Sequence, residues 1–262
     1  MHFLKLAVFC SLTLCTGVTP QINYLVQGMK RKNLALVKTA IQQGADLEVR
    51  LDEGMTYIME CARDSSLFPI FSALVEAGAN IDAQDDYQYS AIHFACGGTG
   101  YAPTAKILIE KGCRLDVQVT DTGNTPLHYA LIAGHAETAR LIIEKIGESP
   151  IVNLKNNNGS NVAHIAALYG DVHLFQYLIE TTNADYMDVN NSDQDCLAIA
   201  VIENNLSIVE YLLRLIVKPD VINTAVLRAA RLALATNHLK VLEFIRSYDA
   251  YRSMSFHVIG KE

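Results

Sequence analysis

Three histidines are the first candidates for chemistry, because they fall at equivalent positions when the sequence is laid against itself. They are His93, His128 and His164. Zinc binds imidazole nitrogens at about 2.0–2.1 Å, whereas segments that stack as neighbouring helices lie on the order of 10 Å apart. Histidines spaced in this way cannot converge on one ion. We therefore predict no metal site and no bound cofactor.

A glycine-rich stretch, Gly97-Gly98-Thr99-Gly100, suggests phosphate binding because it precedes a helix that is expected to begin near Pro103. The N-terminus of a helix attracts anions. However, no Lys-Ser/Thr pair follows the glycines and no strand pattern precedes them, so the phosphate-loop motif is absent. We interpret the stretch as a flexible insertion in a loop.

Two acidic stretches near turns, Asp85-Asp86 and Asp193-Gln194-Asp195, lack the regularly spaced oxygen ligands of a calcium loop. No Ser, Cys or acidic residue lies in a recognisable catalytic motif. The sequence therefore indicates a protein that is not an enzyme. An active site assembled from residues far apart in the sequence is the alternative.

The best-preserved structural element is the stretch of residues 123–134, GNTPLHYALIAG. Thr125 offers a hydroxyl as N-cap, Pro126 suits the first helical position, and Gly134 tolerates the positive φ that often ends a helix. This pattern predicts a helix of about two turns, which is too short to be stable alone. The helix must pack against neighbours.

Similar stretches recur at a step of 33 to 36 residues, and each is followed by the pattern of a second helix. The second helices are expected at residues 68–77, 103–111, 135–146, 171–181 and 206–215. Helical pairs are also expected at 21–30 with 34–41 and at 226–235 with 238–247. Residues 216–224, which include Lys218-Pro219-Asp220, are expected to replace a regular connection before the last pair. A period of this length is the signature of a solenoid of stacked units.

Two motifs within this period are specific. Thr125–Ala130 reads TPLHYA, and Ala79–Asp85 reads ANIDAQD. With the period, they make the chain resemble ankyrin-repeat proteins over residues 20–247. The resemblance implies an all-α ankyrin-repeat solenoid of about six to seven helix-turn-helix repeats with hairpin-like fingers, and it implies that the three histidines hydrogen-bond within and between repeats. The domain is expected to span residues 18–247, with approximate repeats at 20–51, 52–85, 86–119, 120–154, 155–189, 190–221 and 222–247.

The N-terminal residues 1–17 resemble a secretory signal peptide, with Lys5 followed by an apolar run from Leu6 to Cys15. We predict export, to the outside of the cell or the periplasm, if this segment is a signal peptide, and a cytoplasmic protein otherwise. An apolar helix against the first repeat and a bacterial lipoprotein site at Cys15 are alternatives. At the other end, residues 248–262 match no repeat and are expected to form a C-terminal tail.

Removal of residues 1–17 would leave four cysteines, Cys61, Cys96, Cys113 and Cys196. They are widely spaced and do not have the density of a disulfide scaffold. We expect them to be small buried residues.

Composition and charge limit the class of partner. Half of the 262 residues are hydrophobic, which suits a globular protein. Residues 1–51 carry six basic and two acidic residues, residues 52–217 carry eight and twenty-two, and residues 218–262 carry seven and four. This acidic middle argues against a nucleic-acid partner and favours a protein partner with a basic surface. A merely solubilising role of the acids is the alternative.

The resemblance implies a concave surface made of finger tips and the ends of the first helices, and residues there are expected to be free to bind a partner. Tyr87, Tyr89 and Tyr169 are the first candidates, because Tyr is enriched at binding hot spots. The full set is Asp52, Glu53, Met55, Arg63, Asp64, Asp86, Tyr87, Tyr89, Asp121, Thr122, Asn124, Ile132, Asn157, Asn158, Ser160, Leu168, Tyr169, Ser192, Gln194, Ile202 and Glu203.

The expected function is thus that of a non-catalytic module that binds a protein partner. We expect a monomer that binds no nucleic acid and has no stable membrane insertion once a signal peptide is removed. A dedicated regulator or protector of one enzyme in the same compartment is an alternative.

Overall fold

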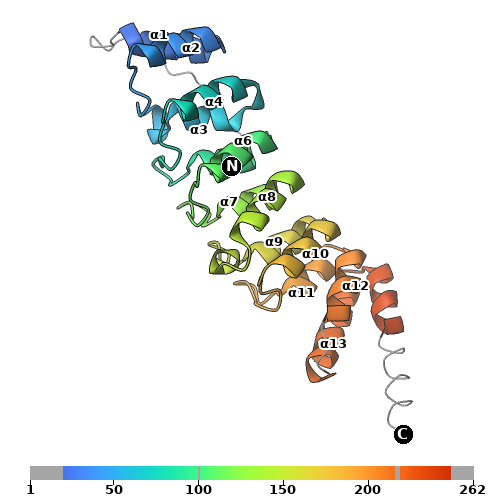
Figure 1. Cartoon of the computed structure of the whole chain (residues 1–262). Helices are drawn as coiled ribbons and strands as arrows, with labels where there is room; N and C mark the ends of the chain where they lie inside the picture. The colour runs from blue at the N-terminus through green and yellow to red at the C-terminus, as the bar shows by residue number, and fades with distance from the viewer. Residues whose placement is uncertain (1–19, 100, 216–218, 249–262) are drawn as a thin grey trace, which may run out of the picture. The chain divides into compact units, whose positions relative to one another are not determined.

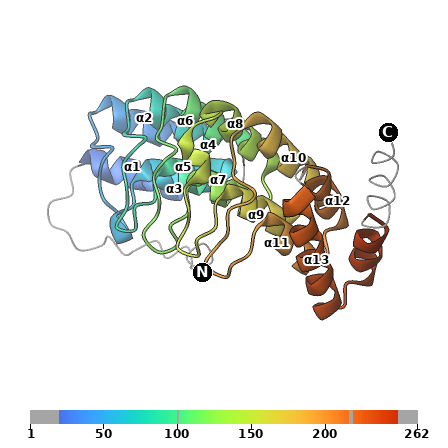
Figure 2. The ribbon, with the colours of Figure 1, turned by 90° about the horizontal axis from the view of Figure 1, so that it is seen from below.

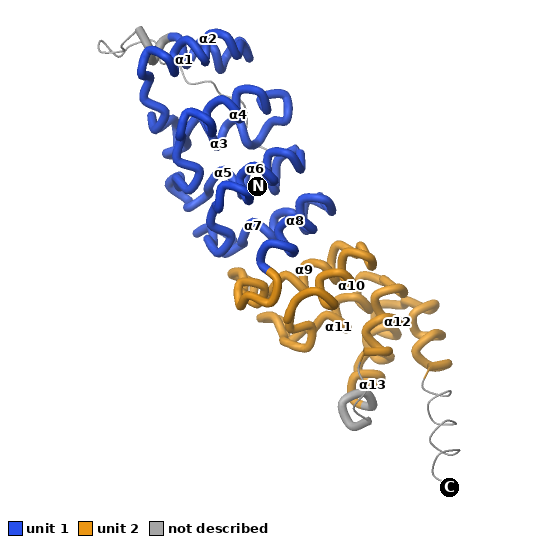
Figure 3. The backbone as a smooth tube through the Cα atoms, in the orientation of Figure 1, with its two compact units in different colours: residues 1–146 blue, residues 147–262 orange. Residues whose placement is uncertain are grey.

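The computed structural model describes residues 20–99, 101–215 and 219–248, and these residues form helices, turns and loops without a strand (Figure 1). The expected signal peptide at 1–17 and residues 249–262 of the expected tail lie outside the described residues. The chain divides into two compact units, residues 1–146 and residues 147–262 (Figure 3). Each unit is considered by itself.

Unit 1 consists of four helical pairs within its described residues. The inner helices α3, α5 and α7 lie side by side, while α4 packs against α2 and α8 packs against α6. The pairs are α1 (Pro20–Lys30) with α2 (Leu34–Gln42), α3 (Tyr57–Arg63) with α4 (Phe68–Glu76), α5 (Ala91–Gly97) with α6 (Ala102–Glu110), and α7 (Pro126–Ile132) with α8 (Ala136–Ile146). Short 3-10 turns at Asp52–Gly54 and Ser65–Leu67 precede α3 and α4.

Unit 2 follows the same plan. Helix α11 lies between α9 and α13, and α10 packs against α12. The elements are a 3-10 turn at Pro150–Asn153, α9 (Val162–Tyr169), α10 (Val172–Thr181), α11 (Cys196–Ile202), α12 (Leu206–Leu215), α13 (Pro219–Ala235) and a final helix that is described through residues 239–248. The helical character of the prediction is confirmed, and the number of six to seven repeats stays a prediction.

Buried caps explain where the short inner helices begin. The backbone N–H of Ser90 donates to His93 Nδ1 at 3.1 Å, and Thr125 Oγ1 lies 2.8 Å from His128 Nδ1. Each cap therefore supplies partners to the start of its helix and to an imidazole three residues later. Since Ala95 and Ala130 are buried and small, neighbouring inner helices can approach closely.

The connections between helical pairs are fingers that project to one side of the helices, as Figure 2 shows for unit 1. We number them as the first (residues 45–55), second (79–89), third (113–124), fourth (147–160) and fifth (184–194). A backbone N–H of one finger donates to a carbonyl of the finger before it. The three such bonds, each 3.0 Å long, are Asp86 N to Glu53 O, Thr120 N to Tyr87 O, and Asn191 N to Asn158 O.

The glycine-rich stretch differs from the flexible insertion that the sequence suggested. Thr99 N donates to Arg63 O at 3.2 Å, and His135 Nε2 donates to Gly98 O at 3.2 Å. A Cβ on Gly98 would lie 2.5 Å from the Arg63 carbonyl oxygen. Gly98 and Thr99 are therefore held by the repeats on both sides, and Gly98 is needed because the backbones approach so closely.

The region before the last pair also differs from the prediction. Helix α13 begins at Pro219, so most of residues 216–224 are helical, and the predicted boundary between residues 221 and 222 falls inside a helix. Pro suits the first turn of a helix because it has no backbone N–H to leave unpaired. The final helix also includes Tyr248, whose hydroxyl donates to Leu213 O at 2.7 Å, so the helical pair extends one residue into the predicted tail.

Cys61, Cys96, Cys113 and Cys196 are buried, as predicted, and their thiols are free. Burial raises the pKa of the Cys113 thiol to about 12 and raises the pKa of the other three thiols as well. Such thiols are poor nucleophiles at neutral pH because they stay protonated. Within the part of the chain that the structure describes, no helix is long and apolar enough to cross a membrane.

Candidate functional site

The predicted binding residues divide into three groups by exposure. Exposed residues are Asp52, Glu53, Asp86, Asp121, Asn157, Asn158, Leu168, Tyr169, Ser192 and Glu203. Half-buried residues are Met55, Arg63, Asp64, Tyr87, Thr122, Ile132, Gln194 and Ile202. Three residues that were expected to be free of packing are buried, namely Tyr89, Asn124 and Ser160.

Tyr89 is buried because its side chain joins two repeats. Its hydroxyl lies 2.6 Å from the Tyr129 hydroxyl and donates toward Asp121, whose nearer carboxylate oxygen is 3.1 Å away. Thr122 Oγ1 lies 3.0 Å from the Tyr129 hydroxyl. Each hydroxyl has one proton to donate, so the bonds can run in one direction, from Thr122 through Tyr129 and Tyr89 to Asp121.

This chain of hydroxyls has a positioning role. Burial and the neighbouring Tyr129 raise the pKa of Tyr89, and burial raises the pKa of Tyr129. Both phenols therefore remain neutral donors near neutral pH and are not poised to act as bases. Their effect is to hold the exposed Asp121 carboxylate at the third finger.

The first and second fingers also carry exposed acids, Glu53 and Asp86, at their tips. Asp86 N donates to Glu53 O, which holds the two finger tips together. Asp85 is buried, and its carboxylate accepts from Tyr87 N and Tyr89 N at 2.9 and 2.8 Å. Burial raises the pKa of Asp85, and the nearby Asp86 and Glu53 raise it further. These fingers therefore concentrate negative charge on an ordered backbone.

Two predicted residues in unit 1 are already engaged with charged neighbours. Asp64 pairs with Lys32 at 2.9 Å, and the hydrogen bond from Lys32 lowers the pKa of Asp64. Arg63 pairs with Glu60 at 3.0 Å. Both pairs are partly exposed, so each is worth only about 0–1 kcal/mol and could be exchanged for contacts with a partner.

Unit 2 offers an apolar surface at the end of α9. Leu168 and Tyr169 are 39% and 54% exposed, and the helix ends directly after them at Gly170, whose φ is 79°. Asn205 Nδ2 donates to Gly170 O at 3.0 Å, so the end of α9 is fixed by the next pair. Two large apolar side chains therefore stand on a rigid base, as binding anchors require.

The finger tips of unit 2 are polar and uncharged at the positions that were predicted. Asn191 Nδ2 donates to Asn157 O at 3.1 Å beside the backbone bond to Asn158 O. Ser160 N donates to Asn156 Oδ1, which explains why Ser160 is buried in the turn. The Gln194 carbonyl accepts from His164 Nε2 at 3.2 Å.

The hydrogen bonding within and between repeats that the resemblance implied is confirmed for His93 and His164, and the bond within the repeat is confirmed for His128. His93 Nε2 donates to Val117 O at 3.0 Å in the following finger, and His164 reaches Gln194 in the same way. Burial lowers the pKa of His93 to about 4 and also lowers the pKa of His164. Among the described residues, no group of three His, Cys, Asp or Glu side chains could hold a metal ion.

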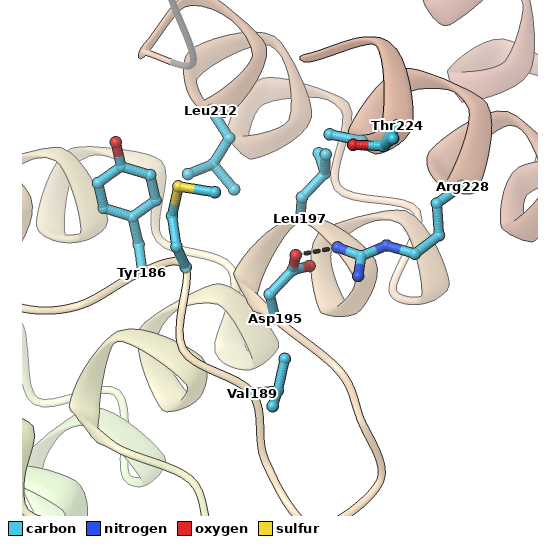
Figure 4. A pocket seen from close by; sticks show the side chains of 9 residues that line it. Tyr186, Val189, Asp195, Leu197, Leu212, Thr224 and Arg228 are labelled. Carbon is cyan, nitrogen blue, oxygen red and sulfur yellow. Dashed lines mark hydrogen bonds and ion pairs between the residues drawn. The ribbon is translucent and has the colours of Figure 1, made fainter. Parts of the chain in front are cut away.

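Sequence reasoning missed a hollow in unit 2 of about 250 Å³. Its lining includes Met187 and Val189 of the fifth finger, Leu197 of α11, Leu212 of α12 and Arg228 of α13 (Figure 4). A signal for it was present in the sequence. Met187 and Val189 are apolar where Asn153 and Lys155 stand one repeat earlier.

Comparison with known families agrees with the architecture. The family model described as ankyrin repeats, in three copies, matches residues 24–121, 68–153 and 146–225. These overlapping matches cover most of the chain. Comparison with curated proteins found no match.

Proposed function

Because the chain belongs to the ankyrin-repeat family, whose members generally serve as protein-interaction modules, we propose that it binds a protein partner through its fingers and inner helices. Proteins of this family are typically non-catalytic. The fold alone does not select a partner, so the choice depends on the chemistry of the exposed residues.

One observation carries the proposal, namely the row of exposed carboxylates on successive fingers of unit 1. Glu53, Asp86 and Asp121 are exposed, and their fingers are joined by backbone hydrogen bonds of 3.0 Å. Because the backbone is already ordered, little conformational entropy is lost when a partner binds there. The carboxylates favour a basic partner surface and increase its association rate at low salt.

The half-buried Tyr87 lies among these acids and completes the proposed surface. Its carbonyl accepts both Thr120 N and Thr120 Oγ1, at 3.0 and 3.2 Å, so its backbone is fixed. Tyrosine supplies a large contact area with few rotatable bonds, which suits it as an anchor. In unit 2, Leu168 and Tyr169 supply the corresponding apolar contacts.

The test is affinity capture from an extract of the source cells with three forms of the immobilised chain. The first form is the wild type, and the second combines Tyr87→Ala, Asp86→Asn and Asp121→Asn. The third is a control with an equal number of acids neutralised on second helices, Glu76→Gln with Glu110→Gln, both of which are exposed.

We expect mass spectrometry to find proteins that the wild type and the control retain and that the triple variant loses. Their retention should also weaken as salt rises, because exposed charges are screened. If the triple variant retains the same proteins in the same amounts as the control, the proposed surface is wrong.

A further inference from the structure

Among the residues that the structure describes, no finger follows the fifth one. Only residues 216–218 separate α12 from α13, whereas the other connections between pairs form the fingers described above. Arg228 of α13 stands at the repeat position where Asn161 and Asp195 cap α9 and α11. The helix therefore begins ten residues earlier than α9 and α11 do in their repeats, and its first turns replace a finger.

The first, second and fourth fingers use polar side chains to reach the finger that follows. Glu48, Asp82 and Asn153 each accept a backbone N–H from the next finger, from Asn80, Arg114 and Asp185, at 2.8 Å in every case. Lys155 Nζ donates to Val189 O at 3.0 Å, and Arg50 donates to Gln84 O. These side chains act as cross-links between neighbouring fingers.

On the fifth finger, the two positions that correspond to Asn153 and Lys155 carry apolar residues. Met187 replaces the acceptor and Val189 replaces the long cation, and they are 45% and 39% exposed. Large exposed apolar side chains that adjoin a hollow indicate an interaction surface rather than ordinary surface. The edge that would meet another finger is thus apolar instead of hydrogen-bonding.

The hollow lies beside this edge. Figure 4 shows Tyr186 and Val189 on the finger and Thr224 and Arg228 on α13, with Leu197 and Leu212 between them. Asp195 caps α11 through one oxygen, with Ala198 N at 2.8 Å, and pairs with Arg228 through the other. The hollow therefore has apolar walls and a fixed, partly exposed guanidinium at its rim.

The backbone of the fifth finger also offers an acceptor. Glu53 O, Tyr87 O and Asn158 O each accept an N–H from the following finger. The carbonyl at this position of the fifth finger belongs to Ser192. The described chain supplies no finger to meet it, so an extended backbone added from outside could donate there, as in the addition of a strand to an open edge.

The charged residues beside the hollow indicate which kind of peptide segment would bind there. Arg231, one turn after Arg228, is exposed, and no described carboxylate forms an ion pair with it. A segment that places a carboxylate near these two arginines gains electrostatic attraction. An apolar segment with acidic residues therefore complements the site better than a basic one.

We infer that unit 2 binds an extended, acidic segment of a partner protein in the place of the absent finger. One apolar side chain of the segment enters the hollow against Met187, Val189 and Leu197. A backbone N–H donates to Ser192 O, and a carboxylate lies near Arg228 and Arg231. This site uses none of Glu53, Asp86, Tyr87, Asp121, Leu168 and Tyr169, the residues that carry the proposed function.

A finger of the chain itself supplies a matched probe. Residues 78–89, GANIDAQDDYQY, combine small apolar residues with three aspartates. We would label a synthetic peptide of this sequence with fluorescein and measure its anisotropy on titration with the full chain. A peptide of the same composition in scrambled order controls for charge alone.

The variants are chosen to leave the fold intact. Val189→Asp and Leu168→Asp are a matched pair, because both parent side chains are 39% exposed and only Val189 lines the hollow. We expect Val189→Asp to weaken binding about tenfold, since an added carboxylate would be desolvated against an apolar wall. Leu168→Asp should leave the affinity unchanged, although it alters the surface of the proposed function.

Several results would overturn the inference. They are the absence of saturable binding, equal binding of the scrambled peptide, or equal weakening by both substitutions. Binding that appears only after residues 249–262 are deleted would assign the hollow to the end of this chain instead. A dimer in light scattering that Val189→Asp converts to a monomer would assign it to a second copy.

Discussion

The fourth and fifth fingers are neighbours in unit 2, yet they differ at three positions that correspond to contacts between the fourth finger and the fifth. The fourth has Asn153, Lys155 and Gly159, and the fifth has Met187, Val189 and Asp193. The fourth finger is joined to the fifth by hydrogen bonds, whereas in the described chain the start of α13 takes the place of a finger after the fifth. The comparison teaches that the residue types on a finger are set by what packs against its far side as well as by its own turn.

The largest effect is expected at Gly159. Its φ is 73°, and a Cβ would lie 2.3 Å from Asn191 Oδ1 and 2.8 Å from Asn191 N. We predict that Gly159→Ala lowers the free energy of unfolding by about 2 kcal/mol or more, because a left-handed backbone alone costs an L-residue roughly 1–2 kcal/mol. Denaturant titration, monitored by circular dichroism, measures this loss of stability.

Asp193 is the control for this prediction, because it has a similar φ of 54° and already carries a side chain. Asp193→Gly removes that side chain where the described chain has no following finger. We expect the free energy of unfolding to change by no more than about 0.5 kcal/mol. Equal losses in the two variants would show that contact with the next finger does not determine the residue type.

The starts of the inner helices also differ from one another, because some carry a histidine and others do not. The dependence of stability on pH distinguishes the two kinds of start. The His93 pKa is lowered from 6.5 to about 4 in the folded chain, so the unfolded chain binds more protons between these values. The contribution of neutral His93 is therefore complete above pH 6.5 and is lost as pH falls toward 4. At α11 the corresponding residue is Ala198, which has no such dependence.

We predict that the stability difference between wild type and His93→Gln shrinks by about 1.4 kcal/mol for each pH unit between 6 and 4. Glutamine can still donate to Val117 O but does not titrate. Unfolding titrations at pH 7, 6 and 5 test this, and a difference independent of pH would show that His93 is not buried in its neutral form.

A smaller effect, this time an increase in stability, is expected at the start of α3. Here Met59 occupies the histidine position, and the buried Thr56 Oγ1 has no hydrogen-bond partner. We predict that Met59→His raises the stability by about 1 kcal/mol, since one buried hydroxyl gains a partner. Thermal unfolding is sufficient to measure it, and a decrease would show that the thioether packs better than an imidazole.

The sequence predicted the helix starts well because their causes are local. Thr125 and Pro126 are adjacent, and their roles follow from residue type alone, whereas the role of His128 was implied by the family resemblance. The buried position of Tyr89 was not predictable in this way, because its partner Tyr129 lies forty residues further along the chain. The same holds for Gly98, whose neighbour Arg63 belongs to the preceding repeat.

The candidate binding residues were predicted from repeat position, which assumes that equivalent residues have equal exposure. Leu168 and Tyr169 are exposed as that assumption requires, whereas Asn124 and Ser160 are buried by turns specific to their own fingers. The hollow depends on an absent finger, so no single repeat shows it. Comparison of Met187 and Val189 with their counterparts in the other fingers would have indicated it.

Site-specific photo-crosslinking tests the central claim most directly, namely that the finger surface of unit 1 contacts the partner. A photoreactive phenylalanine analogue would be placed at Tyr87 and, as a control, at the exposed Lys106 on the second helix α6. We predict a covalent adduct with the captured partner from position 87 and none from position 106. An adduct from position 106 alone, or equal adducts from both, would contradict the account.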